Sequence, residues 1–441
     1  MKASGTKALR AERLIDGTGE GITGGVVVIV EGSKIKSIGE ERSTRLPPGV
    51  EVMDYGDATL MPGLIDCHMH TGAENVMIFK NYRTATFEVS PQFHMFCSLL
   101  NAQLCLEGGI TTIRDLGWVT PWGLFTAELC AVRDAINRGF VPGPRLLVAG
   151  WAVTTYSHLE MLMPHNAPRR EGVTADGPWE LRKMVRSQLR VGSDLIKTVA
   201  SGGGGTDVQD PNVKNMCFEE IAAIVDEAHG FNKIVACHTW TPESQKRAIK
   251  AGVDTLEHCV WADDESIELM VKHRKPLTPT LLHRTDHAID IVRRTGADEF
   301  VLKNYKSVQA DCFATFKKLI DAGVTIAMGT DLNIDPEMGS NAGEISLYVD
   351  LGMKPMDAIQ AGTINAAEAI GLGEVTGSLT PGKYADILAV KGDPLKNHNV
   401  FEGRQNFLMV MKEGTIYVDR RKGHERHVLD DATYGKWDMV Q

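Results

Sequence analysis

The sequence has few of the features of a secreted or membrane-spanning protein. Its 441 residues include only eight cysteines, and no two of them form a Cys-x-x-Cys pair. A chain of this length can bury a large core and needs no disulfide framework, so we expect reduced cysteines and a cytoplasmic location. No apolar segment of the signal-peptide kind follows Met1–Arg10. The longest apolar run near the start, Val26–Val30, is far shorter than the roughly 20 residues of a membrane-spanning helix.

The chain has fewer basic residues than acidic residues. Lys and Arg total 47 against 57 for Asp and Glu, which gives a formal net charge of -10. Because an acidic surface repels phosphate groups, we expect neither nucleic acid nor an anionic membrane as a partner. The apolar share of 43% and the charged share of 24% are ordinary for a soluble globular protein, and they exclude disorder, collagen and coiled coil.

Both ends of the chain carry short strand-like segments. Apolar runs between Gly, Pro and Asp turns are typical of small β-sheets, and they cover residues 8–14, 25–31, 34–38 and 59–61 near the start and 385–391, 406–412 and 415–419 near the end. The simplest arrangement pairs the two ends with each other. We therefore predict one small β-sandwich domain built from residues 1–61 and 371–441.

The middle of the chain alternates strand-like and helix-like segments. Short apolar strands followed by helices are typical of a parallel sheet, and eight such runs occupy residues 64–67, 111–114, 145–149, 195–199, 234–237, 255–257, 276–280 and 325–328. Eight units in roughly 300 residues fit a closed barrel better than an open sheet. The predicted fold class is α/β, with a (β/α)8 TIM barrel over residues 62–370.

Six ionisable residues lie at or near the C-terminal ends of five of these strands: His68, His70, Lys197, His238, His258 and Asp331. The C-terminal ends of barrel strands form the face where active sites lie. A single histidine beside a strand is more often a core or surface group than a ligand, and Asp is a common helix cap. However, alternate residues of a strand point to the same side, so His68 and His70 can reach one ion. Six such residues on one face are hard to obtain by chance.

The motifs around these residues resemble the amidohydrolase superfamily. Pro62–His70 resembles its opening signature, and Gly192–Gly203 resembles the lysine strand of the branch that holds prolidase-like and imidazolonepropionase-like enzymes. The remaining motifs match in the right order at Cys237-His238, Glu257-His258, Gly329-Thr330-Asp331 and Gly382–Ile387. The resemblance covers roughly residues 7–420.

The resemblance implies two divalent metal ions. Its ligand sets would be His68, His70 and Asp331 for the first ion and His238 and His258 for the second, with Lys197 bridging both through a carboxyl group derived from carbon dioxide. A lysine buried in an apolar strand loses its charge readily, and the neutral amine can form such a carbamate. Oxygen and imidazole ligands suit Zn²⁺, with Co²⁺ or Mn²⁺ as alternatives.

The resemblance also implies the reaction, the hydrolysis of a C–N bond by a hydroxide held between the two ions. Asp331 would take the proton and return it to the leaving nitrogen. His158 is a second catalytic candidate, because relatives often carry a histidine that stabilises the oxyanion after the third strand. Its usual glycine neighbours are missing in Thr155–Leu159.

Four tryptophans lie within a few residues of the strand ends: Trp118, Trp151, Trp240 and Trp261. They either pack between loops or line an aromatic pocket for the substrate. Prolidase-like relatives often have His-Ala-Tyr at the fifth strand, where the tyrosine helps to hold a substrate carboxylate, and this chain has His238-Thr239-Trp240. Because indole fits a carboxylate less well, we predict a neutral, bulky, aromatic amide, carbamate or urea, as in herbicide-degrading hydrolases of this superfamily.

Alternatives remain open. The chain could be an Xaa-Pro dipeptidase or carboxypeptidase-like relative, in which Arg169, Arg170 or Arg284 binds a carboxylate. A non-catalytic scaffold of the same fold is disfavoured, because scaffolds usually lose metal ligands and this chain retains all six. By analogy with relatives, we expect a homo-oligomer that acts on a small-molecule substrate.

Overall fold

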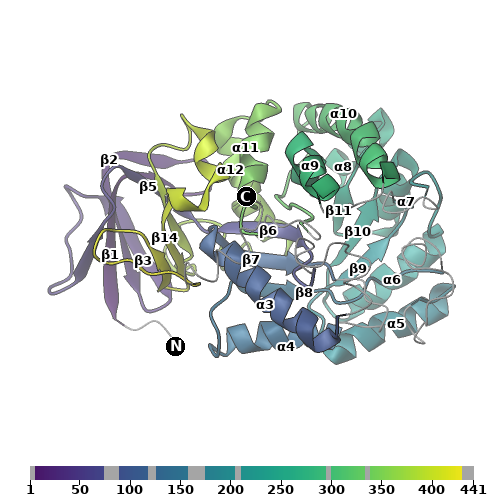
Figure 1. The fold of residues 1–441 in the computed structure, drawn as a ribbon, viewed down its shortest axis with the longest axis horizontal. Coiled ribbons are helices and arrows are strands. Elements are labelled where there is room, and N and C mark those ends of the chain that lie inside the picture. Colours follow the sequence, from purple (N-terminus) through teal and green to yellow (C-terminus); the bar gives the residue numbers. More distant parts are fainter. Residues whose placement is uncertain are drawn as a thin grey trace.

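The computed structural model describes residues 5–73, 89–117, 126–156, 174–203, 210–294, 299–332 and 338–429. Within these ranges no helix is long and apolar enough to cross a membrane. The molecule combines an antiparallel-rich sheet at one end with a larger part in which strands and helices alternate (Figure 1). The α/β fold class predicted from the sequence is confirmed.

Strands from both ends of the chain form one eight-stranded sheet. Its order is β15-β14-β13-β5-β1-β2-β3, and β4 pairs with β1. The bounds are β1 (Thr6–Ile15), β2 (Gly21–Glu31), β3 (Lys34–Glu40), β4 (Glu51–Asp54), β5 (Ala58–Pro62), β13 (Ile387–Lys391), β14 (Phe407–Lys412) and β15 (Thr415–Asp419). The two chain ends meet where β5 and β13 pair antiparallel, with Leu60 opposite Ala389.

The run Val26–Val30 in β2 shows why the apolar pattern predicted these strands. Successive side chains of a strand point to opposite faces. Val26, Val28 and Val30 accordingly join the main core of the sheet, while Val27 and Ile29 pack with Ala8 on the other face. Only β4 was missed, because Met53 is its single buried residue and the segment carries no apolar pattern.

The larger part contains two parallel sheets. The first consists of β6 (Leu64–Met69), β7 (Ile110–Asp115) and β8 (Arg145–Val148), and the second of β9 (Ile196–Val199), β10 (Val235–Thr239), β11 (Thr255–His258) and β12 (Leu277–Thr278). These seven strands coincide with seven of the eight predicted for the middle of the chain.

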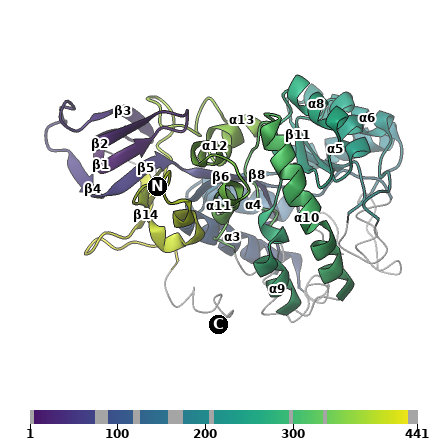
Figure 2. The ribbon, with the colours of Figure 1, turned by 90° about the horizontal axis from the view of Figure 1, so that it is seen from above.

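Helices separate most of these strands. They are α3 (Pro91–Glu107), α4 (Thr126–Asn137), α5 (Pro178–Val191), α6 (Phe218–Gly230), α7 (Pro242–Ala251), α8 (Asp264–Lys272), α9 (Asp286–Arg294), α10 (Glu299–Asp321), α11 (Gly343–Asp350), α12 (Pro355–Ala361) and α13 (Ile364–Ala369), with the short 3-10 helices η2 (Leu282–Arg284), η3 (His398–Glu402) and η4 (Arg404–Asn406). Figure 2 shows α11, α12 and α13 between the eight-stranded sheet and the helices α5, α6 and α8 at the opposite end of the molecule.

The eighth predicted strand, residues 325–328, is not a regular strand. Ile326 makes one isolated bridge with Leu277. The pairing is also irregular on the opposite edge, because the Met328 amide, which faces away from β12, binds the carbonyl of Ala361 instead of a residue of β6. The segment nevertheless lies beside β12 on one side and β6 on the other, where the Cys67 amide donates to the Met328 carbonyl.

Capped helices fix the loops that follow β10 and β11. The hydroxyl of Thr241 accepts a hydrogen bond from the Ser244 amide and Pro242 opens α7, so this helix begins immediately after the strand. Asp263 caps α8 in the same way through the Ser266 amide. Both loops are therefore short and anchored close to the strand ends.

Candidate metal centre

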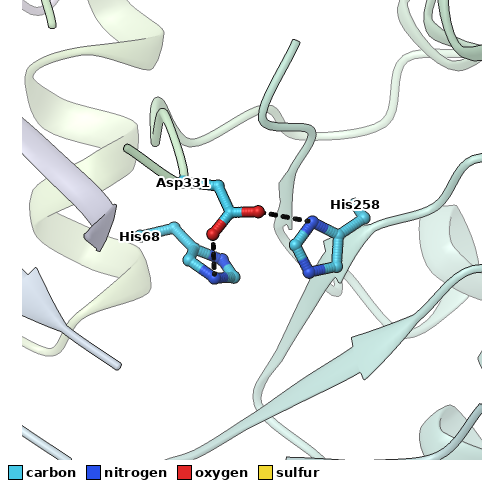
Figure 3. A group of neighbouring side chains, drawn as sticks. All are labelled: His68, His258 and Asp331. Carbon is cyan, nitrogen blue, oxygen red and sulfur yellow. Dashed lines mark ion pairs between the residues drawn. The ribbon is translucent and has the colours of Figure 1, made fainter. Parts of the chain in front are cut away.

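His68, His258 and Asp331 form a cluster at the C-terminal ends of β6 and β11 (Figure 3). One ligand atom of each lies within 4.8 Å of the other two. The Asp331 carboxylate lies between the two rings, with Oδ1 3.5 Å from His68 Nε2 and Oδ2 3.9 Å from His258 Nδ1. Both histidines are buried and Asp331 is mostly so.

The other three predicted ligands lie around this cluster. His70 Nε2 is 3.0 Å from Asp331 Oδ1, and Lys197 Nζ is 3.5 Å from His68 Nε2. The ring centroid of His238 lies 4.6 Å from that of His258. The structure thus brings together all six residues that the sequence singled out, although they come from five separate segments. Their role as metal ligands remains a prediction.

The backbone near the cluster is unusually strained. Seven non-glycine residues of the described chain have φ in the left-handed region, and four of them lie here: His258 (73°), Cys259 (51°), Thr280 (55°) and Asp331 (57°). Such conformations are unfavourable for L-residues and persist where the surrounding structure holds them, often at functional sites. For Asp331, the holding contact is a 2.7 Å hydrogen bond from its amide to the His68 carbonyl.

A buried carboxylate orients His68. Nδ1 of His68 lies 2.7 Å from Glu257 Oε2, and Glu257 Oε1 accepts hydrogen bonds from Arg114 Nη2 and Thr255 Oγ1, each at 2.7 Å. Burial alone would raise the pKa of Glu257, but Arg114 and His68 lower it well below its usual range. The ionised carboxylate therefore accepts a hydrogen bond from the Nδ1–H of His68 and leaves the Nε2 lone pair facing Asp331 and Lys197.

Burial favours the uncharged form of three nitrogen groups in the cluster. It lowers the pKa of His68 to about 4 and that of Lys197 to about 8, and it lowers the pKa of His258 well below its usual value. His70 differs, because Asp331 and the Gly117 carbonyl raise its pKa despite its burial. Asp331 stays ionised, since His68 and His70 lower its pKa more than burial raises it. Imidazole nitrogens around one carboxylate form the donor set that zinc and similar ions bind, so the residues present fit a metal site.

His283 in η2 also lies beside the cluster and was not predicted from the sequence. Its Nε2 lies 3.7 Å from Asp331 Oδ2, and burial together with Arg284 lowers its pKa to about 3. Buried Glu344 holds this turn by accepting hydrogen bonds from the amides of Leu281 and Leu282 at 2.7 and 2.6 Å. The sequence could have indicated His283 as a further candidate, because it comes three residues after the predicted strand 276–280, as the other candidates lie near strand ends.

The tryptophans divide into two groups. Trp240 is buried and stacks on His238 with ring centroids 6.0 Å apart, and Trp261 meets Trp240 edge-on at 6.3 Å. Trp151 is buried in the main hydrophobic core. The structure thus places Trp240, backed by Trp261, beside the predicted ligands. The predictions for Trp118, His158, Arg169 and Arg170 fall on residues outside the described ranges.

The network behind His68 makes a prediction about stability. Arg114→Met should lower the free energy of unfolding by about 3–5 kcal/mol, because it leaves the fully buried Glu257 carboxylate without its cation. Urea denaturation measures this change. Arg294→Met is the matched control, since it breaks the exposed pair with Asp290 and should cost at most about 1 kcal/mol. Equal small losses in both variants would show that the buried pair is not needed to hold Glu257.

Comparisons with known proteins agree with this geometry. Residues 59–417 match the Amidohydrolase family. Ochratoxinase from Aspergillus niger is 32% identical over 434 residues, which cover 92% of this chain and 85% of the relative. The crystal structure of a Xaa-Pro dipeptidase with bound methionine in the active site is 29% identical with a TM-score of 0.83, covering 94% of this chain and 100% of that one. Phenylurea hydrolase B (22% identity, TM-score 0.76, 94% and 97% covered) shares the fold.

The family match runs from β5 to β15 and includes all six clustered residues. It confirms the resemblance found in the motifs of the sequence. The chain therefore belongs to the amidohydrolase family, and it is a hydrolase that acts on C–N bonds.

Proposed function

We propose that this hydrolase is metal-dependent and cleaves the C–N bond of a bulky aromatic amide, carbamate or urea. The observation that carries the proposal is the convergence of His68, His258, Asp331 and Lys197 within a few ångströms of one another. The position of Trp240 against His238 supports an aromatic substrate, because it places an aromatic side chain beside the reacting groups.

We also infer that β6 to β12 and the segment 325–332 close into a (β/α)8 barrel. This barrel domain would span residues 62–370, and residues 1–61 and 371–441 would form the β-sandwich domain. Two sets of contacts support closure. Val153, after β8, bridges Thr198 in β9, and the segment 325–332 bonds to both β12 and β6. Closure would place all six predicted ligands on the C-terminal face, where barrel enzymes bind their substrates.

The proposed ions are two Zn²⁺, with Co²⁺ or Mn²⁺ as alternatives. Ligands for them would be His68, His70, His238, His258 and Asp331, with a carboxyl group on Lys197 between the two positions. When bound, such ions acidify a water molecule and polarise a carbonyl group. Lys197 is suited to carboxylation because burial lowers the pKa of its amine, so that the reactive neutral form is available near neutral pH.

Asp331 is the group best placed to move the proton. Its carboxylate is ionised and therefore ready to accept one, and it lies between His68 and His258. After accepting a proton from the attacking water, it would return the proton to the leaving nitrogen. Glu257 keeps His68 in a fixed orientation during this exchange.

A second candidate function is a dipeptidase. The dipeptidase structure that is 29% identical to this chain supports it, as does the similarity of the two folds over nearly their whole lengths. The two candidates share the same reacting groups and differ in whether the substrate must offer an aromatic group or a small amino acid.

A substrate panel tests the proposal. The zinc-loaded enzyme should hydrolyse N-aroyl amino acids, anilides, aryl carbamates or phenylureas at least about 10-fold more efficiently than Xaa-Pro dipeptides without aromatic groups, since aliphatic substrates lack the aromatic contacts of a site that contains Trp240 and Trp261. Removing the ions with a chelator should abolish turnover, and adding Zn²⁺ should restore it. Turnover of the aliphatic dipeptides alone would favour the second candidate, and turnover unaffected by the chelator would contradict both.

A further inference from the structure

Glu344 is a fully buried carboxyl group that the proposed reaction does not use. It lies in the first turn of α11. Its two oxygens accept hydrogen bonds from consecutive amides at the start of η2, Leu281 to Oε1 at 2.7 Å and Leu282 to Oε2 at 2.6 Å. Burial raises the pKa of this carboxyl to about 8, because the amide donors replace only part of the lost water. A buried carboxyl is costly to keep, and what it provides here is a two-point clamp on one turn of the backbone.

The clamped turn begins directly after Thr280, whose backbone is strained. The φ angle of Thr280 is 55°, in the left-handed region, where a β-branched residue is an outlier. Such a conformation persists only where the surrounding contacts hold it. The hydrogen bonds to Glu344 fix the two residues after Thr280, and β12, which ends at Thr278, fixes the chain before it.

The strained residue contacts a predicted metal ligand. Oγ1 of Thr280 lies 2.9 Å from Nδ1 of His258, and both side chains are buried. When Nδ1–H donates to this oxygen, the lone pair of Nε2 is left for an ion. Glu257 holds Nδ1 of His68 in the same way. A carboxylate therefore holds His68 directly, whereas His258 is held by a hydroxyl whose own position depends on a carboxyl group one step further away.

We propose that Glu344 is a positioning residue for metal binding. By clamping the amides of Leu281 and Leu282 it keeps Thr280 in its strained conformation, and thereby keeps the Thr280 hydroxyl on His258. The inference rests on the proposed function, because His258 must bind an ion for the clamp to affect the site. It goes beyond that function by assigning a role in ion affinity to a residue of α11 whose hydrogen bonds go to the backbone of another segment.

Zinc retention tests the proposal without requiring turnover. The zinc-loaded enzyme is equilibrated with a chelator at buffered free Zn²⁺, and the bound zinc is measured by elemental analysis. Glu344→Gln keeps the shape of the side chain but offers one acceptor oxygen to two amides. One zinc equivalent should then need about 10-fold more free Zn²⁺ for half-occupancy, at the lower end of the usual cost of losing a group behind a metal ligand. Half-occupancy of both equivalents within about two-fold of the wild type would overturn the proposal.

Glu107 provides a matched control for the loss of a buried carboxyl. It is also fully buried, at the end of α3, and it accepts hydrogen bonds from Arg420, His427 and the Val428 amide, which anchor the C-terminal segment. Glu107→Gln should lower the urea midpoint at least as far as Glu344→Gln, since it also weakens an ion pair with Arg420, yet its zinc occupancy should match the wild type. Equal losses of zinc affinity in both variants would assign the effect to general destabilisation and overturn the proposal.

Thr280→Val tests the path from Glu344 to His258. Valine keeps the branched shape but lacks the hydroxyl, so it should weaken the same zinc equivalent about 10-fold. Because both substitutions break one path, the double variant should also lose about 10-fold, instead of the roughly 100-fold expected of independent sites. An additive loss would overturn the path through Thr280. If Glu344→Gln does not fold, Glu344→Asp takes its place, since the shorter side chain cannot reach both amides, and the same loss and the same lack of additivity are expected.

The outcomes also separate this inference from the proposed function. A wild type that holds two zinc ions and hydrolyses aryl amides, with unchanged zinc affinity in Glu344→Gln, would retain the proposed function and overturn the clamp. Zinc binding that depends on Glu344, without hydrolysis of any compound in the substrate panel, would support the clamp and contradict the proposed reaction. A wild type that binds no zinc would contradict both.

Discussion

Lys197→Ala should lose bound metal and turnover together. If a carboxylated Lys197 joins the two ion positions, its removal takes away a ligand from both, and we expect kcat to fall by at least about 10³-fold because the ions also supply the polarisation of the carbonyl. Elemental analysis of the purified variant should find less than half of the wild-type metal. Growth with carbon-13 bicarbonate should give the wild type a carbamate signal that the variant lacks.

Two control variants separate the loss of the Lys197 amine from other effects of the substitution. Lys250→Ala removes an exposed lysine of α7 and should change neither the metal content nor kcat. Lys197→Met fills the buried space while removing the amine, so a shared loss in both Lys197 variants would point to the amine and not to a cavity. Full metal content and full activity in Lys197→Ala would contradict the bridging role.

The strands of this fold could be predicted from the sequence because their signal is local. Most of them are short runs of apolar residues between turns, and such runs fit a buried pleated surface. The segment 325–328 carries the same signal and still does not form a regular strand, and on its β6 edge the Met328 amide binds a distant carbonyl at Ala361. No local pattern reveals that competition.

The six clustered residues were also predictable, because each follows an apolar run and the C-terminal ends of parallel strands share one face. The groups that hold these six residues in place could not be predicted. Arg114 and Glu257 are separated by 143 positions, and in the sequence each is an ordinary charged residue within a predicted strand. Only the fold shows that they share one buried hydrogen-bond network with His68.

Trp240 shows what the position of a residue in the sequence cannot reveal. Its substitution for the usual tyrosine indicated a site with little affinity for a carboxylate. In the structure, Arg284 lies over the indole, from a segment 44 positions further along the chain. The sequence could rank Arg284 only with Arg169 and Arg170, since burial and long-range contacts are properties of the folded chain.

Asp331→Asn tests the proton transfer itself. The amide has nearly the same shape, and asparagine tolerates the left-handed backbone that Asp331 adopts, so we expect the variant to fold and keep the remaining predicted ligands in place. It cannot accept a proton, and kcat should fall by about 10³- to 10⁴-fold, in the range typical of a lost acid–base group. Metal content should stay above half of the wild-type value.

The choice of leaving group makes this test specific. A nitroanilide leaves without much help from an acid, whereas an alkylamine must be protonated as it departs. If Asp331 returns the proton to nitrogen, Asp331→Asn should harm cleavage of the alkylamide at least about 10-fold more than cleavage of the nitroanilide, and the exposed control Asp290→Asn should affect neither. Equal losses for both substrates, accompanied by loss of metal, would instead assign Asp331 the role of a ligand alone, and His283, whose Nε2 lies 3.7 Å away, would become the candidate acid.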